Sequence, residues 1–223
     1  MKYFSILFLS VACILSSCSV LKMLPDYSKI EKVLNKEIST EHFIYHMSKD
    51  DSVKQYWEEN YYNWLTKKLN ITPTEKIHYY KYKDVNQKYL LTGSKGNAIT
   101  LDDRIHTVIP YDNHELVHVL VGKYIGNPPK MFTEGIAVAH QTNPFENDFI
   151  PKWGKEPIDK IVYELNGKSQ IPPLDSLLVM SQYFKYSENI TYPISGSFVK
   201  YLLQIYGYEK FYEFIKECDW KCS

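Results

Sequence analysis

The sequence has no excess of charge of either sign. Its 223 residues include 26 lysines and arginines and 26 aspartates and glutamates, so the formal net charge is zero. Such a balance gives no overall electrostatic attraction for nucleic acid or for anionic substrates. We therefore expect no nucleic-acid partner, and any substrate preference must come from local chemistry.

Cysteine is scarce, with four residues in the chain. Cys13 and Cys18 fall in the first eighteen residues, whose pattern is not that of a folded domain, so Cys218 and Cys222 remain for the folded body. Their spacing fits half a metal site, but no second cysteine or histidine pair lies nearby, and a local disulfide or two free thiols is the favoured interpretation. Internal repeats, low-complexity runs and a second long apolar span are also lacking, which excludes repeat architectures and a multispan membrane protein.

The N-terminal segment has the features of an export signal. Met1-Lys2 is a short basic start, and residues 4–15 form an apolar run too short to cross a bilayer. The sequence Leu-Ser-Ser-Cys at 15–18 resembles the lipobox of bacterial lipoproteins. The resemblance implies that residues 1–17 are removed, that Cys18 is lipidated, and that the protein is anchored to a membrane of the cell envelope. An ordinary signal peptide cut nearby is the alternative.

After a tether at residues 18–27, we expect a single domain, 28–223, of the α+β class. Extended stretches are predicted at 42–47, 77–82, 98–101 and 105–109. Helical patterns are predicted at 27–38, 52–69, 112–124, 131–142, 157–165, 174–181, 194–206 and 208–217. This order predicts a small sheet lobe, about 40–110, followed by a mostly helical lobe, about 111–223, with a cleft where they meet.

The segment 114–118, His-Glu-Leu-Val-His, is difficult to explain by folding alone. Positions i and i+4 of a helix share one face, so His114 and His118 can reach one zinc ion while Glu115 stands beside the open coordination position as a general base. Asp112 is placed to cap this helix. The alternative is that both histidines are satisfied by ordinary hydrogen bonds and that Glu115 is the capping-box partner of Asp112.

A catalytic zinc needs a third protein ligand from a second element. Glu134 follows in a largely apolar stretch, 131–138, where a carboxylate is costly unless it is paired or bound to a metal. Gly135 and Ala137 are small enough to let this helix lie close to the first. The alternative is an acid favoured by the dipole at a helix start. The prediction is one Zn²⁺ per chain with three ligands, His114, His118 and Glu134.

Together, residues 114–120 and 132–138 resemble the zinc motifs of the gluzincin metallopeptidases, the thermolysin and aminopeptidase N clan, and most of all their short peptidase MA-like domains. A looser similarity in order and spacing extends the match to about residues 40–215. The resemblance implies a zincin-like fold with zinc between the two lobes, and hydrolysis of peptide bonds. It also implies that Tyr192 donates a hydrogen bond to the oxyanion, a role that a phenol can fill without adding charge.

Two departures limit what the resemblance implies. The glycine-rich motif by which aminopeptidases of the clan recognise a free amino terminus is missing between Gly93 and His114, so the choice between endo- and exopeptidase stays open. Gln141 stands where many members carry an acid that supports a ligating histidine. Either Gln141 is a weaker acceptor for that histidine, or another group such as Asp102, Asp103 or a backbone carbonyl takes the role.

The site residues leave more than one function open. The favoured function is a zinc metallopeptidase acting on peptides or proteins outside the cytoplasm. A catalytically weak or inactive lipoprotein that binds or scaffolds is the alternative, and hydrolysis of a non-peptide ester or amide would use the same chemistry. His106 and His140 lie near the site in sequence, but we expect them to be packed residues with ordinary hydrogen bonds.

Overall fold

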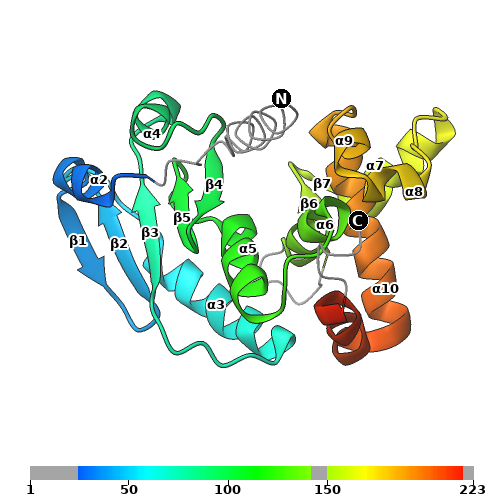
Figure 1. Ribbon diagram of the computed structural model, residues 1–223, viewed down its shortest axis with the longest axis horizontal. Helices are drawn as coiled ribbons and strands as arrows, with labels where there is room; N and C mark the ends of the chain where they lie inside the picture. The colour runs from blue at the N-terminus through cyan, green and yellow to red at the C-terminus, as the bar shows by residue number, and fades with distance from the viewer. Residues whose placement is uncertain (1–24, 142–149, 218–223) are drawn as a thin grey trace, which may run out of the picture.

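A computed structural model describes residues 25–141 and 150–217 (Figure 1). The predicted export signal, the lipidation candidate Cys18, and Cys218 and Cys222 lie outside the described residues. The class is mixed α+β, about 55% helical, with a small mixed sheet, as the sequence predicts. In residues 25–141 and 150–217, no helix combines the length and the apolar character needed to span a membrane.

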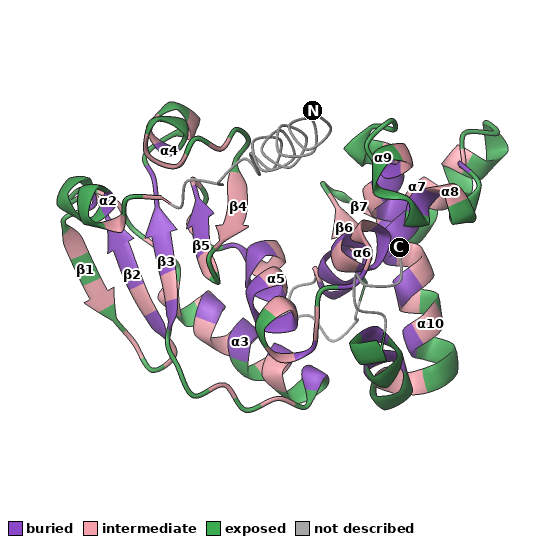
Figure 2. Ribbon diagram, in the orientation of Figure 1, coloured by how far each residue is buried: buried purple, intermediate pink, exposed green. Residues whose placement is uncertain are grey.

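A five-stranded sheet forms one end of the molecule (Figure 1). Its spatial order is β1 (Lys36–Ser39), β2 (Phe43–Met47), β3 (Ile77–Lys81), β5 (Arg104–Thr107) and β4 (Ala98–Leu101). The three central strands run parallel, whereas β1 and β4 pair antiparallel at the two edges. Burial follows this order, because the central strands are mostly buried and β4 is only half-buried along its length (Figure 2).

Helices cover both faces of the sheet. Aromatic and aliphatic residues of β2, β3 and β5 pack on α3 (Gln55–Leu69) and α5 (Asn113–Tyr124) on one face. The opposite face packs on α2 (Tyr27–Val33) and α4 (Val85–Thr92). Burial of these apolar side chains, at about 25 cal/mol per Å², is the main stabilisation of the lobe.

The helical lobe is built around two long helices, α6 (Lys130–His140) and α10 (Glu188–Glu217). Two glycines let them touch: a Cβ on Gly135 would lie 2.6 Å from the Ser195 carbonyl oxygen, and one on Gly196 would lie 2.4 Å from Val138 Cγ1. Gly135 therefore faces α10, and the expectation that it brings α6 against α5 is wrong. The main core continues from the sheet through α5 into these helices.

The remaining elements of this lobe are short. They are a two-stranded ribbon of β6 (Lys152–Trp153) and β7 (Glu156–Pro157), and the helices α7 (Ile158–Gly167), α8 (Leu174–Leu178) and α9 (Met180–Tyr183). A small apolar cluster packs beneath α8 and α9.

Several predicted boundaries are corrected. The helix expected over 27–38 ends at Val33, and Ile38 belongs to β1. The helix expected to start after Pro193 begins at Glu188, with Pro193 inside it, while the predicted break near 207 is confirmed because Gly207 adopts φ 78°. The expected helix over 174–181 divides into α8 and α9, and α4 and the β6–β7 ribbon were not predicted.

Candidate metal centre

The centre begins with the capped start of α5. Asp112 Oδ1 accepts the backbone N–H of Glu115 at 3.1 Å, so the predicted N-cap is confirmed. Its Oδ2 accepts from the Thr107 hydroxyl at 2.8 Å. The backbone N–H of Asp112 donates to Glu58 Oε1 of α3 and not to Glu115, so the reciprocal half of a capping box is made by a residue from another helix.

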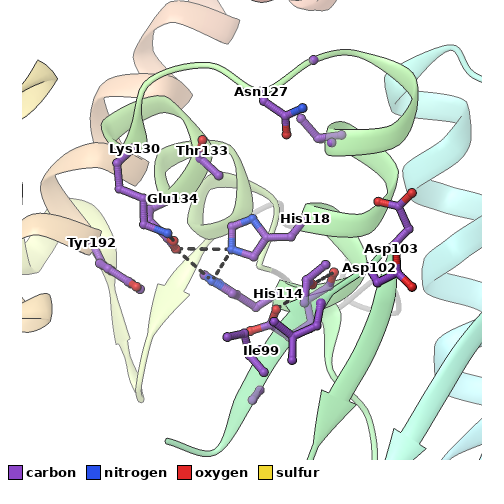
Figure 3. Close-up of a pocket in the computed structure, with 17 residues that line it drawn as sticks. Ile99, Asp102, Asp103, His114, His118, Asn127, Lys130, Thr133, Glu134 and Tyr192 are labelled. Atoms are coloured by element: carbon purple, nitrogen blue, oxygen red, sulfur yellow. Dashed lines mark hydrogen bonds and ion pairs between the residues drawn. The ribbon is translucent and has the colours of Figure 1, made fainter. Parts of the chain in front are cut away.

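Three side chains from α5 and α6 converge on one point (Figure 3). Glu134 Oε2 lies 3.1 Å from His114 Nε2 and 3.4 Å from His118 Nε2, and the two imidazole nitrogens are 3.0 Å apart. Zinc bound tetrahedrally at about 2.0–2.1 Å needs ligand atoms about 3.3 Å apart. The triangle is within a few tenths of an ångström of that spacing, so this group could hold a metal ion.

The ionisation of Glu134 and that of the two histidines, His114 and His118, depend on each other. Burial works against ionisation of Glu134, but hydrogen bonds and charge from His114 and His118 hold the pKa of its carboxyl well below the usual range. Burial likewise works against protonation of His114, yet Glu134, with Glu115 and Asp112, raises the pKa of His114 to about 9. A cation is therefore favoured between these groups, whether it is a proton or a metal ion.

Lys130 holds the other oxygen of Glu134. Its Nζ lies 2.5 Å from Glu134 Oε1, one helical turn earlier on α6, and the lysine side chain is 28% exposed. This ion pair leaves Oε2 directed at the two histidines (Figure 3). Sequence reasoning missed Lys130, although its i,i+4 spacing from Glu134 was a visible signal.

The outer contact of His114 comes from Gln141. Its Oε1 lies 3.3 Å from His114 Nδ1, a distance at the weak end for a hydrogen bond. Asp102 and Asp103 instead form the tight turn between β4 and β5, with φ of 52° and 54°, and line the rim of the pocket. Of the side chains named as candidate acceptors, Gln141 is thus the one that contacts His114 within the described residues.

Glu115 faces a pocket of about 580 Å³ beside the triangle. Its Oε2 accepts a hydrogen bond of 2.8 Å from the Thr100 hydroxyl, and Thr100 belongs to the edge strand β4. The pocket lies between β4 and α5 on one side and α6 and Tyr192 on the other, which is the meeting of sheet lobe and helical lobe. The alternative that Glu115 serves as a capping-box partner does not hold.

Tyr192 lies at the same pocket, on the side of Glu134 (Figure 3). Its ring is parallel to that of His114, with an interplanar angle of 3° and centroids 6.0 Å apart, and Trp153 packs against it at 4.8 Å. Burial, and then the charge of Glu134, raise the pKa of the Tyr192 phenol, so it remains a hydrogen-bond donor at neutral pH. Trp153, on β6, was not singled out in the sequence.

The two other histidines considered in the sequence are packed residues, as expected. His106 is fully buried on the sheet, stacked on Tyr80 at 4.9 Å and hydrogen-bonded to the Tyr82 hydroxyl. His140 donates from Nδ1 to the Ile136 carbonyl at 2.8 Å. Neither lines the pocket at the triangle.

Comparisons of the chain with protein-family models, with curated proteins and with solved structures found no match. The chemistry of the centre therefore has to be inferred from its own residues. Those residues supply two imidazole nitrogens and one carboxylate oxygen at metal-binding separations, with a second carboxylate and a phenol at the same pocket.

Proposed function

We propose that the protein is a zinc-dependent metallopeptidase of the gluzincin type with a zincin-like fold. The observation that carries the proposal is the position of Glu115. Its carboxylate is released from helix capping and faces a pocket next to His114, His118 and Glu134. A carboxylate held beside a three-ligand centre is what a hydrolytic site needs and what a purely structural metal site does not.

The donor set favours zinc among the common divalent ions. Two neutral imidazoles and one carboxylate suit zinc, whereas magnesium and calcium prefer shells made of oxygen alone. Three protein ligands leave one position open, as in catalytic rather than structural zinc sites. We therefore expect one Zn²⁺ per chain on His114, His118 and Glu134.

The residues around the pocket have separate roles in the proposed hydrolysis. His114, His118 and Glu134 would hold the zinc ion, which when bound would acidify water and polarise the carbonyl of the scissile bond. Glu115 accepts the proton of the attacking water on its carboxylate and delivers it to the leaving nitrogen. Tyr192 donates its phenolic hydrogen to the oxyanion, a contribution often worth several kcal/mol. The Thr100 hydroxyl keeps the Glu115 carboxylate directed at the pocket.

The substrate is a peptide or protein, and the site of action lies outside the cytoplasm. All four residues of the edge strand β4 line the pocket beside Glu115, and an edge strand has backbone groups to which an extended peptide can pair. Cys18, in the lipobox-like segment, would carry the lipid anchor that holds the protein on a membrane of the cell envelope.

A peptide library tests the activity directly. Zinc-loaded protein is expected to cleave some peptides, to lose this activity with a chelator, and to regain it when zinc is restored. A folded protein that holds zinc and cleaves nothing would contradict the proposal.

Two contacts favour a second candidate, a binding or scaffolding lipoprotein with little turnover. Lys130 already neutralises Glu134, and Gln141 is a weaker support for His114 than an acid would be. The Lys130 cation competes with a metal ion for Glu134, and the weak hydrogen bond to Gln141 lowers the affinity of His114 for a metal ion. Under this candidate the protein binds peptides from the same library with equal affinity in the presence and absence of zinc.

A further inference from the structure

Glu58 of α3 is a buried acid that the proposed chemistry does not use. Its side chain is fully buried, and Oε1 accepts the backbone N–H of Asp112, the residue that caps α5. Within residues 25–141 and 150–217, Oε2 has no hydrogen-bond partner. Burial raises the pKa of Glu58 to about 8. Burial of a carboxyl group with one oxygen unpartnered among the described residues destabilises the fold, which indicates that Glu58 is retained for a functional reason.

Its position is the one that the fourth residue of a capping box normally takes. In such a box the glutamate three residues after the cap reaches back to the N–H of the cap residue. In α5 that glutamate is Glu115, the proposed base, and the cap residue is Asp112. If Glu115 filled this role, its carboxylate would turn away from the pocket toward the start of its own helix.

We propose that Glu58 is a positioning residue for Glu115: it occupies the N–H of Asp112 from outside the helix and so keeps the Glu115 carboxylate on Thr100, facing the pocket. The inference rests on the proposed function, because it assigns Glu58 a part in orienting the base. The carboxylates of Glu58 and Glu115 are alternative acceptors for one donor, the backbone N–H of Asp112. Glu58, which is fully buried, accepts this N–H, so the donor is satisfied inside the protein without the Glu115 carboxylate.

The test replaces Glu58 by leucine, which fills the buried site with an apolar side chain of comparable volume but removes the acceptor. Glu115, three residues after the cap, is then free to accept the N–H of Asp112 as in a capping box, and we expect its carboxylate to move from Thr100 to the cap. We expect kcat to fall about 100-fold, as for loss of a general base, with KM and zinc content near wild type. Glu58→Gln, which keeps an acceptor oxygen, should restore kcat to within a few fold of wild type.

Glu59→Leu is the matched control, because Glu59 lies on the same helix and accepts from His42 away from the pocket. It should lower stability and leave kcat unchanged. The proposal is overturned if Glu58→Leu loses no more kcat than this control, or if Glu58→Gln loses as much as Glu58→Leu.

Crystal structures give a readout that does not depend on turnover. In Glu58→Leu, the Glu115 carboxylate should be found on the N–H of Asp112; a carboxylate still on Thr100 overturns the proposal, even if the wild type cleaves no peptide and the proposed function fails. If Glu58→Leu does not fold, Thr100→Val gives the converse measurement. With Glu58 in place, Glu115 should stay away from the cap in that variant, and its movement to the cap would overturn the proposal.

Discussion

Replacing Glu115 by glutamine should separate catalysis from folding and from metal binding. Glutamine keeps the size of the side chain and an oxygen that can accept from Thr100, so the 2.8 Å hydrogen bond can persist. The start of α5 is unaffected, because Glu58 and not Glu115 takes the N–H of Asp112. We expect the free energy of unfolding to change by less than about 0.5 kcal/mol.

The loss in turnover should be far larger. An amide cannot accept the proton of the attacking water, and general-base catalysis contributes about 10²- to 10⁴-fold. The activation free energy should therefore rise by about 3–5 kcal/mol. Zinc content should stay near wild type, because Glu115 is not among the three proposed ligands. His118→Ala provides the contrast, since it should lose the metal and the activity together.

The assay compares kcat on a cleaved peptide, zinc per chain and the urea midpoint of unfolding for wild type, Glu115→Gln and His118→Ala. Wild-type activity in Glu115→Gln would refute the assignment of the base. A large fall in its unfolding midpoint would refute the account of the capped helix start.

Three further predictions concern packing, the ion pair and pH. Gly135→Ala should destabilise the protein by about 1–3 kcal/mol, because its Cβ would meet a backbone carbonyl of α10, whereas Gly167→Ala, with nothing within 4 Å, should be neutral or slightly stabilising in the same unfolding assay. Lys130→Met should tighten zinc binding about tenfold in a competitive chelator titration, because it removes a cation competing for Glu134; unchanged or weaker binding would contradict this. Burial lowers the pKa of His140 to about 4, so its contribution to stability is full above its unfolded pKa of about 6.5 and falls by about 3 kcal/mol as the pH drops to 4. His140→Gln should flatten that part of the stability profile, and an unchanged profile would exclude the assignment.

The grouping of His114, His118 and Glu134 could be predicted because its signals are local. Two histidines four residues apart share a helix face by geometry alone, and Asp112 is a capping residue at the expected place. Glu134 stood out because a carboxylate in an apolar helix is costly. The structure brings these residues together at the lobe interface.

What the sequence did not predict depends on long-range contacts. Ile38 continues the helical spacing from Leu34, yet it pairs with Tyr45 in the sheet, because strand pairing outweighs a short helix. Pro193 suggested a helix start, but buried packing on both sides of it keeps α10 continuous there. The contact of Glu58 with Asp112 joins α3 to α5 across the fold, and no spacing rule connects the two.

The central claim is that His114, His118 and Glu134 form a zinc site. It is tested most directly by elemental analysis of purified protein after refolding with zinc and removal of the excess. We expect about one zinc per chain, held tightly because three ligands are supplied by packed helices, and little in His118→Ala. Less than about a tenth of an equivalent in the wild type would contradict the claim.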